Sequence, residues 1–582
     1  MNSPIASHNL ILQYQRLSAH FNRQNEVLTT VDELADALCC TRRNVNLVLS
    51  KMSIQDWLVW VPSRGRGKKS RLTLLAKDSN LTVQLAIQTA NQGHLEDAFG
   101  MLNSGNEKTA LFDYLKTQLG FQGHKNQSLR MPYHRQIAEL NPAQATRMTE
   151  IHMIHQIMDN LVVFEKSSQT IKPHLAHSWR VNEDSTRWTF FLRPGISFHH
   201  GRPLIADDAK ATLIHLRDSH GPFQRLYRHI IDVSCPTSYT VEVQLAQKDH
   251  LFLHLLSNQS SVIQPYELMH QKDFYSHPVG TGPFKIASNN SFQLKLEAND
   301  QYFKERALLD GVEILFFTNE EKALENPSDL YLTTSHTNKY QSMQHNYKVE
   351  IGYQYLLFNV ENKHSPVQDL RIRRCIRSMI DGQAMVQDLG GERASVAQRL
   401  LPEWEHDTQR LMFQVRPRMP MRLERPLKMC TYDVHIEDAR WIQKTLAGFD
   451  IPTELMVLDY HEFSDPSHWL EADLVLSSEA LDDNLEMSLY EWFATQRSLQ
   501  HCMGLEQREV IADKLNKALA LPSRIQRMDA FRLMDIHLQQ ELVLLPLYHH
   551  QQQMHYGEGI QGLHLNSLGW VDFKDIWFDD GR

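Results

Sequence analysis

No stretch of about 18 consecutive apolar residues occurs in this 582-residue sequence, so no segment is expected to cross a membrane as a helix. Cysteine is scarce, and the six cysteines are too scattered for a disulfide-stabilised scaffold. The start of the chain also lacks a basic segment followed by about 7–15 apolar residues, the pattern of a secretory signal peptide. These features predict a protein without a membrane partner that stays in the cytoplasm.

Sequence motifs for catalysis, cofactors and metals are missing as well. The chain has no HExxH, no GxSxG and no paired CxxC, and the GTG at Gly280–Gly282 lacks the spacing of a dinucleotide-binding loop. Histidine pairs such as His199–His200 are adjacent in sequence, so their rings cannot face one ligand from a helix or a strand. We therefore predict no catalytic residues, no cofactor and no metal ligands.

The charge of the chain is unevenly distributed. Residues 1–77 contain 11 Lys and Arg against 5 Asp and Glu, a net charge of +6, whereas the remaining residues carry a net charge of −15. Such an asymmetry is typical of a nucleic-acid-binding segment that is attached to a different kind of domain.

Two short helical patterns follow one another within this basic segment. Leu34, Ala35 and Leu38 share one apolar face, and Val45, Val48 and Leu49 share another. The break between them, Cys39–Thr41, ends at a residue whose hydroxyl can cap the second helix. Two helices with this separation predict a helix-turn-helix, in which the second helix enters the major groove of DNA.

A basic hairpin is predicted directly after these helices. Trp57–Val61 and Arg71–Leu75 have the composition of paired strands, and no acidic residue occurs from position 57 to position 77. The helices and the hairpin together predict a winged helix-turn-helix that binds double-stranded promoter DNA. The residues that we expect to contact DNA are Thr41, Arg42, Arg43, Asn44, Asn46, Arg64, Arg66, Lys68, Lys69 and Arg71.

The rest of the chain divides into a connector and a large α/β block. Residues 78–128 have helical patterns interrupted by glycine, and we expect them to form a helical connector after a DNA-binding domain at 1–77. Residues 129–582 alternate strand-like runs such as WTFFLRPG with helix-like runs such as RIRRCIRSMI. This alternation predicts an α/β domain that is long enough to hold two cores.

Several separated segments of this block resemble extracytoplasmic solute-binding proteins of family 5. LRMPYHRQIAELNP at Leu129–Pro142 is similar to the family's opening segment, and PVGTGPFK at Pro278–Lys285 is similar to its hinge-proximal segment. Similar patterns also occur at Ile171–Thr212, Tyr355–Asn362 and Asp369–Asp381, and the resemblance covers about residues 129–578. It implies a two-lobed, type II periplasmic-binding-protein-like fold that closes on a ligand.

The same resemblance implies where a ligand would bind. The ligand-contacting residues that it suggests are Gly280, Gly282, Phe284, Asn359 and Asp482. Asp482 matches the aspartate that holds the amine in peptide-binding members, although Glu479 stands where those members have tryptophan. An alternative is that the GTGPF turn and Asn359 only hold the hinge.

A basic winged helix joined to a family 5 domain resembles the SgrR-type transcriptional regulators, and LQYQRL at Leu12–Leu17 fits their first helix. The resemblance implies a one-component regulator that senses a small molecule, either a sugar phosphate or a peptide-like ligand, with a link to sugar-phosphate stress. The main alternative is a peptide-type solute-capture component of an ABC transporter. Two others are an enzyme and a DNA-binding protein whose solute domain is an inert dimerisation scaffold.

Overall fold

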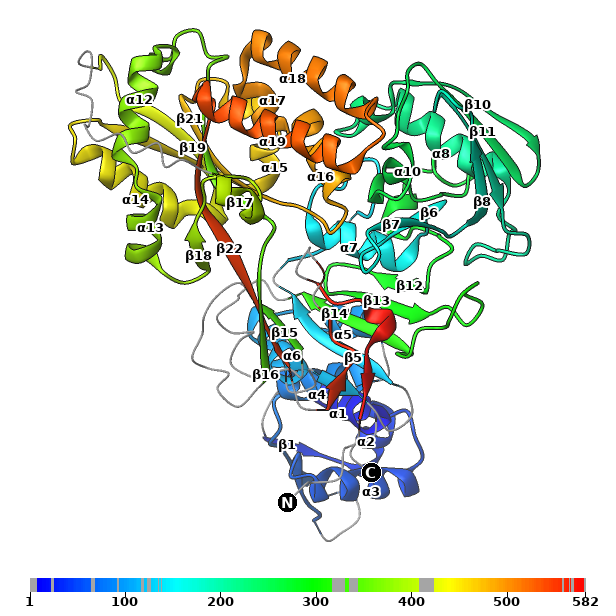
Figure 1. Ribbon diagram of the computed structural model, residues 1–582. Coiled ribbons are helices and arrows are strands. Elements are labelled where there is room, and N and C mark those ends of the chain that lie inside the picture. Colours follow the sequence, from blue (N-terminus) through cyan, green and yellow to red (C-terminus); the bar gives the residue numbers. More distant parts are fainter. Residues whose placement is uncertain are drawn as a thin grey trace. The chain divides into compact units, whose positions relative to one another are not determined.

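The computed structural model of the protein divides into two compact units. It describes residues 8–21, 26–63, 68–91, 94–116, 120–122, 127–133, 135–137, 139–316, 330–333, 344–407, 423–556, 559–564, 566 and 570–579. The N-terminal unit consists of residues 1–119 with 316–326, and the C-terminal unit consists of residues 120–315 and 327–582. Figure 1 shows the helices and strands of both units.

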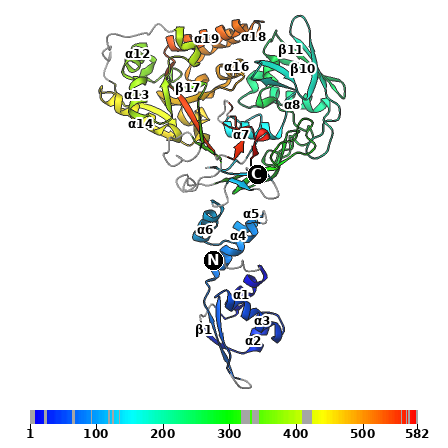
Figure 2. The ribbon, with the colours of Figure 1, turned by 60° about the horizontal axis from the view of Figure 1, so that its bottom comes forward.

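The N-terminal unit begins with a winged helix (Figure 2). Its elements are α1 (His8–His20), β1 (Glu26–Thr29), α2 (Val31–Ala37), α3 (Arg42–Ile54), β2 (Leu58–Val61) and β3 (Ser70–Leu74). The strands form an antiparallel sheet in the order β1-β3-β2, with Leu58 of β2 opposite Leu74 of β3. The two predicted helices and the predicted hairpin are confirmed, whereas β1 was not predicted.

Apolar residues at helical spacing build the core of this winged helix. Tyr14 of α1 is fully buried, its ring meets Trp57 edge to face at 5.8 Å, and its hydroxyl donates to the carbonyl oxygen of Ala76 at 2.8 Å. A capping box starts α2, because the Thr30 hydroxyl accepts from the Glu33 amide and the Glu33 carboxylate accepts from the Thr30 amide. These contacts fix α2, and with it the turn that leads into α3.

Three more helices follow in the N-terminal unit: α4 (Asp78–Asn91), α5 (Leu95–Gly100) and α6 (Gly105–Lys116). Leu81 and Leu85 of α4 are buried in the same hydrophobic cluster as the helices of the winged helix. The helix that follows the wing therefore packs against the winged helix and extends its core.

The first lobe of the C-terminal unit is built on two sheets. One sheet has the order β10-β11-β9-β8, and the other has the order β12-β13-β14-β5-β4. Their strands are β4 (Gly120–Gln122), β5 (Ser128–Tyr133), β8 (Ala176–Val181), β9 (Arg187–Leu192), β10 (Ile230–Thr237), β11 (Thr240–Leu245), β12 (Phe284–Asn289), β13 (Gln293–Ala298) and β14 (Gly311–Phe316). The helices of this lobe are α7 (Met148–Ile157), α8 (Ala206–Asp218), α9 (Gln224–Tyr227) and α10 (Phe252–Leu255).

Two small hairpin-like pairs complete the first lobe. The first joins β6 (Val162–Glu165) to β7 (Thr170–Pro173), and the second joins β23 (Ile560–Gln561) to β24 (Trp577–Phe578). The segment that contains β23 and β24 thus belongs to the same lobe as β5.

The second lobe is organised around an eight-stranded mixed sheet. Its main path is β15-β22-β17-β21-β19-β20, and β16 and β18 also pair with β22. The strands are β15 (Leu330–Thr333), β16 (Gln344–Val349), β17 (Gly352–Phe358), β18 (Arg393–Val396), β19 (Leu427–Tyr432), β20 (Thr453–Leu458), β21 (Leu474–Ala480) and β22 (Leu544–Tyr556). The helices are α12 (Leu370–Met379), α13 (Gly382–Leu389), α14 (Ile436–Ala447), α15 (Tyr460–Phe463), α16 (Leu485–Thr495), α17 (Arg497–Cys502), α18 (Gly504–Leu519) and α19 (Arg524–Gln540).

Strand β17 lies at the centre of this lobe, and all seven of its residues are buried. It pairs antiparallel with β21 on one side and with β22 on the other, whereas β19 runs parallel to both β20 and β21. Because β21 is held between β17 and β19, its C-terminal end at Glu479 and Ala480 has a fixed position. That end forms part of the site described next.

Candidate functional site

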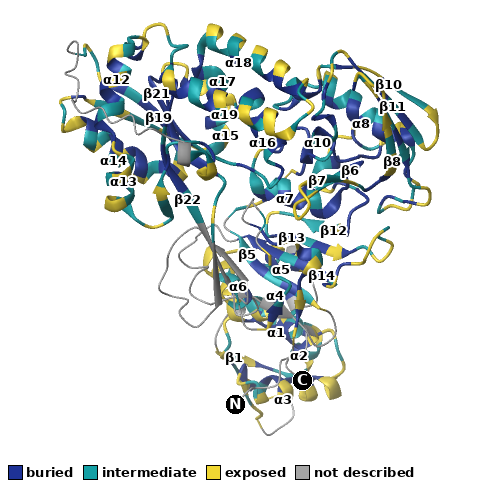
Figure 3. Cartoon of the chain, in the orientation of Figure 1, coloured by how far each residue is buried: buried dark blue, intermediate teal, exposed yellow. Residues whose placement is uncertain are grey.

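Helix α3 has two faces of opposite character, which Figure 3 shows as alternating buried and exposed segments. Val45, Val48, Leu49 and Met52 are buried against the winged-helix core. The exposed residues of the helix include Arg42, Arg43, Asn44, Asn46, Leu47, Ser50 and Lys51. The predicted apolar face of this helix is therefore confirmed, and the predicted polar side chains lie on its exposed side.

Thr41 occupies the N-cap position of α3 but does not cap it as expected. Its hydroxyl makes no capping hydrogen bond, so the predicted side-chain cap is wrong. Its carbonyl oxygen instead accepts from the amides of Asn44 and Val45 at 2.9 and 3.0 Å. The Thr41 side chain is exposed beside the start of the helix.

Two of the predicted DNA-contacting arginines have acidic partners within the winged helix. The Arg42 guanidinium donates twice to the Asp32 carboxylate of α2, and Arg71 of β3 lies 3.1 Å from the Glu26 carboxylate of β1. All four side chains are more than half exposed, so these pairs contribute little to stability. Arg43 makes no ion pair with any described residue, and its charge is available to a partner.

The wing is held at its base by Ser63. The Ser63 amide donates to the Ser70 hydroxyl at 3.1 Å, and the Ser63 hydroxyl donates to the carbonyl oxygens of Lys68 and Lys69 at 3.2 and 2.9 Å. Lys68 and Lys69 are exposed. The other two predicted contacts of the wing, Arg64 and Arg66, lie outside the described residues.

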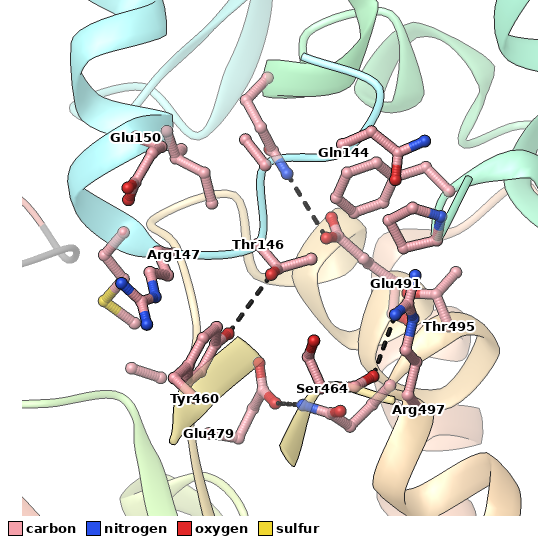
Figure 4. Close-up of a pocket in the computed structure, with 18 of the residues that line it drawn as sticks. Gln144, Thr146, Arg147, Glu150, Tyr460, Ser464, Glu479, Glu491, Thr495 and Arg497 are labelled. Carbon is pink, nitrogen blue, oxygen red and sulfur yellow. Dashed lines mark hydrogen bonds between the residues drawn. The ribbon is translucent and has the colours of Figure 1, made fainter. Parts of the chain in front are cut away.

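A cavity of about 800 Å³ lies between the two lobes of the C-terminal unit (Figure 4). The first lobe contributes the segment before and within α7 and residues near Asn258, and the second lobe contributes α15, the end of β21 and α16. Its polar and aromatic lining includes Arg135, Arg147, Glu150, Asn258, Gln259, Tyr432, Tyr460, Glu479, Asp482, Glu491, Trp492 and Arg497. We refer to it as the interlobe cavity.

Side chains from the two lobes meet across this cavity. The Arg147 guanidinium lies 4.2 Å from the centroid of the Tyr460 ring, and the Asn258 amide donates to the Glu491 carboxylate at 2.8 Å. The Gln259 amide donates to the other oxygen of the same carboxylate at 3.4 Å. Side chains of the two lobes are therefore in direct contact beside the cavity.

Of the five ligand-contacting residues suggested by the sequence, the structure places Asp482 in the wall of the interlobe cavity. Gly280, Gly282 and Phe284 do not line it; the two glycines lie in the turn that leads into β12, and Phe284 is the first residue of that strand. Asn359 does not line it either: it is buried, and its side-chain amide donates to the carbonyl oxygen of Ala472 at 2.8 Å. The structure therefore does not bring the five residues together.

The GTGPF turn packs closely against the end of α7. The Gly282 amide donates to the carbonyl oxygen of Ile157 at 2.9 Å, and the Thr281 hydroxyl donates to the Asp159 carboxylate at 2.8 Å. His199 uses both ring nitrogens on this turn, at 3.3 Å from the Gly280 amide and 3.0 Å from the Gly282 carbonyl oxygen. Burial lowers the pKa of His199, which favours the neutral ring that this bonding requires.

Two glutamates of the cavity wall have unusual protonation equilibria. Burial raises the pKa of Glu479 to about 8, and the charge of Glu491 also raises it. The hydrogen bond that the Gln496 amide donates to the Glu479 carboxylate at 2.6 Å lowers this pKa and offsets part of the rise. Burial also raises the pKa of Glu491 to about 7, with a contribution from the charge of Asp482. The sequence comparison noted Glu479 only as a replacement for tryptophan, and nothing in the sequence singled out Glu491.

The arginines near these acids are engaged elsewhere. Arg135 forms a two-pronged pair with Glu150, with N–O distances of 2.6 and 2.8 Å. Arg497 donates to the carbonyl oxygen of Ser464 at 2.9 Å. Among the residues that the structure describes, no arginine or lysine contributes to the pKa values of Glu479 or Glu491.

The raised pKa of Glu479 predicts a specific dependence of stability on pH. Between pH 4.5, its ordinary value, and about pH 8 the folded chain keeps a proton that the unfolded chain releases, so this group contributes less stability as pH rises. The free energy of unfolding of Glu479→Gln, relative to that of the original protein, should therefore increase by about 2–3 kcal/mol from pH 6 to pH 8.5. Urea unfolding of both proteins at the two pH values measures the gain.

Glu139→Gln is the matched control for this measurement, because Glu139 also lines the cavity but is exposed. It should leave the pH dependence unchanged. If the free energies of unfolding of Glu479→Gln and of the original protein changed with pH in parallel, the raised pKa of Glu479 would be contradicted.

Comparisons with known proteins follow the same division of the chain. Residues 9–128 match the family model described as "Sugar transport-related sRNA regulator N-term", and residues 170–411 match "Bacterial extracellular solute-binding proteins, family 5 Middle". The HTH-type transcriptional regulator SgrR of Yersinia pestis (strain Pestoides F) is 31% identical over 574 residues, which cover 97% of this chain and 98% of the relative. The chain belongs to the SgrR family of HTH-type transcriptional regulators.

A second relative agrees with this SgrR-family assignment, and solved structures show the fold of the larger part of the chain. The SgrR of Shigella flexneri is 30% identical over 557 residues, 94% of this chain and 95% of the relative. A dipeptide-binding protein from Pseudoalteromonas sp. SM9913 in complex with Met-Leu has a TM-score of 0.66 at 18% identity, covering 78% of this chain and 100% of its own. NikA from Brucella suis in complex with Fe(III)-EDTA has a TM-score of 0.65 at 16% identity, with the same coverage.

The predicted fold class, a two-lobed solute-binding-protein-like α/β domain preceded by a winged helix, is thereby confirmed. Because SgrR relatives match along nearly their whole length, a transporter component is not favoured. The relatives are regulators and solute-binding proteins rather than enzymes. Within the described part of the chain, no helix is long and apolar enough to cross a membrane, and no group of three or more His, Cys, Asp or Glu has the geometry of a metal site.

Proposed function

We propose that this transcriptional regulator binds duplex promoter DNA through α3 and the β2–β3 wing. The observation that carries the proposal is the exposed face of α3, which presents arginine and asparagine side chains and no acidic residue. Arginine pairs with guanine edges and asparagine with adenine edges in the major groove, while wing lysines neutralise phosphates. The proposed contacts remain Thr41, Arg42, Arg43, Asn44, Asn46, Lys68, Lys69 and Arg71, together with Arg64 and Arg66.

The proposal divides the chain into a DNA-binding domain at 1–77, a helical segment at 78–128 and a ligand-sensing domain at 129–582. A regulator of this kind must reach the chromosome, so we place it in the cytoplasm. Mapping the DNA that the full chain occupies in cells should give discrete sites upstream of genes. Occupancy spread evenly along the chromosome would contradict sequence-specific regulation.

The interlobe cavity is the proposed sensor. A ligand that binds the closed form more tightly than other forms would shift the protein toward the closed state, and only such differential affinity can alter DNA binding. Cavities of several hundred Å³ are typical of small-molecule sites, and this one has about 800 Å³. The neighbouring solute-binding proteins bind their ligands with the same fold, which supports this use of the cavity.

Charge favours an amine-bearing ligand over a sugar phosphate. Glu479, Asp482 and Glu491 line one side of the cavity, and the carboxyls of Glu479 and Glu491 accept hydrogen bonds from neutral amides only. A protonated amine would compensate their buried charge, whereas a phosphate dianion there would add to the repulsion. An amino sugar or the amine of a short peptide satisfies this requirement.

Paired sugars test this preference directly. Calorimetric titration of the full chain should show glucosamine binding at least about tenfold more tightly than glucose, because the two differ in one amine that a carboxylate can hold. Affinity for glucosamine should rise from pH 6 to pH 7, where its amine stays largely protonated, as Glu491 begins to ionise, since the pKa of Glu491 lies at about 7. A neutral dipeptide and glucose 6-phosphate complete the set of probes.

Glu479→Gln and Glu491→Gln should each reduce the preference for the amine to less than about threefold, and Glu139→Gln should preserve it. Tighter binding of glucose 6-phosphate, with glucosamine no better than glucose, would contradict the amine proposal. If no probe raises the melting temperature, the result would favour an inert scaffold, because a ligand that binds the native state stabilises it.

A further inference from the structure

Two residues on the exposed side of α3 are apolar, Leu47 and Ile54, and Ile54 is the last residue of the helix. Leu47 lies in the middle of the helix and is 55% exposed, although the buried face of the same helix is formed by Val45, Val48, Leu49 and Met52. The sequence pattern alone indicates no role for Leu47, because a leucine in a helical pattern is usually part of the core. The structure places it on the opposite side, among the side chains that are proposed to face DNA.

The neighbours of Leu47 on the helix surface are all polar. Residues three and four positions away share its face, and these are Arg43, Asn44, Ser50 and Lys51, each of them exposed. Two are cations, and α3 contains no acidic residue. A second copy of the same face would bring like charges together around Leu47, which disfavours self-association. A polyanion that also presents an apolar group to Leu47 is a better partner for this face of α3.

We propose that Leu47 contacts the 5-methyl group of a thymine in the major groove and so determines base preference. The inference rests on the proposed DNA-binding function. The thymine methyl is the apolar feature that distinguishes base-pair edges in this groove, and aliphatic side chains recognise it. Neither a phosphate nor a guanine edge would gain from contact with a leucine.

The geometry of the helix also restricts where this thymine lies. Leu47 follows Arg43 by four residues, a rise of about 6 Å along the helix axis. Base pairs are stacked about 3.4 Å apart. The thymine should therefore lie within about two base pairs of the base that Arg43 contacts.

Replacing thymine by uracil removes only the methyl group, which makes the test specific. Duplexes that the full chain prefers are first selected from a random pool, and each thymine is then replaced by uracil in turn. One position per recognition helix should lose about fourfold in affinity, the equivalent of one buried methyl group. In Leu47→Ala, the thymine and uracil duplexes should bind equally, within about 1.5-fold.

Leu75→Ala is the matched control, because Leu75 is 53% exposed and lies outside α3. It should keep the full sensitivity to uracil. The proposal is overturned if no thymine is sensitive, or if Leu47→Ala retains the sensitivity of the original protein. Failure to select any preferred duplex would instead contradict the proposed DNA-binding function, so the two failures are distinguishable.

Discussion

Replacing Arg43 and Asn46 together with alanine should weaken binding of the full chain to its preferred duplex by about 100-fold. Both side chains are exposed on α3, and Arg43 makes no ion pair with a described residue. Each bidentate contact with a base edge is worth about 1–3 kcal/mol, so the loss of two gives an effect of this size. Fluorescence anisotropy with selected and scrambled duplexes measures both affinity and base preference, and the preference should nearly disappear.

The wing should behave differently from α3. Lys68→Ala combined with Lys69→Ala should weaken binding to every duplex alike and reduce the slope of log affinity against log salt by about 2, because phosphate contacts release counterions. Lys108→Ala, an exposed lysine of α6, is the control and should change neither quantity. If the α3 variant bound its selected duplex normally, the winged helix would not be the DNA-binding element.

The order of elements in the winged helix could be predicted because each has a local signal. Helical spacing of leucine and valine indicated α2 and α3, and an acid-free hairpin indicated the wing. Strand β1 (Glu26–Thr29) gave no such signal, because four residues contain too little alternation and the strand is stabilised by its pairing with β3. Its existence depends on a partner about 45 residues away in the sequence.

The same limit applies to the side chains of the DNA surface. The sequence identified Arg42 and Arg43 as equivalent, but Asp32, ten residues earlier, holds the Arg42 guanidinium and leaves Arg43 open. The exposure of Leu47 was not predicted, because periodicity cannot tell which side of a short helix is covered when apolar residues lie on both. Only the packing of α3 decides this.

Prediction was weaker for the ligand site, because a cavity between lobes gathers residues from distant segments. Of the residues that the family resemblance suggested, Asp482 lines the cavity, whereas Gly280, Gly282, Phe284 and Asn359 do not. Glu491 was missed, since its importance depends on Asn258 and on burial, neither of which is visible in the local sequence. The GTGPF turn was recognisable as a motif, but a motif does not reveal whether it contacts a ligand or the protein itself.

Substitution of Gly280 with alanine decides between these two roles of the turn. A Cβ atom at this position would lie 2.1 Å from the carbonyl oxygen of Ile157 and 2.7 Å from the Met158 side chain, so the backbone at the end of α7 would have to move. Forcing extra volume into such a packed site costs about 3 kcal/mol. We therefore expect a large drop in the urea midpoint of the C-terminal unit.

The ligand affinity of the folded Gly280→Ala fraction should be close to normal, because Gly280 does not line the interlobe cavity. Gly448→Ala is the control: Gly448 ends α14 with a φ of −63°, and its Cβ would lie 3.3 Å from the nearest atom, the carbonyl oxygen of Thr445. Gly448→Ala should lower the free energy of unfolding by less than about 1 kcal/mol. If Gly280→Ala were as stable as Gly448→Ala but no longer bound the probe that the original protein binds, the turn would be part of the ligand site. The close approach of Gly280 and Gly282 to Ile157 leads us to expect the opposite, a turn that fixes α7 so that the residues before it can form the cavity wall.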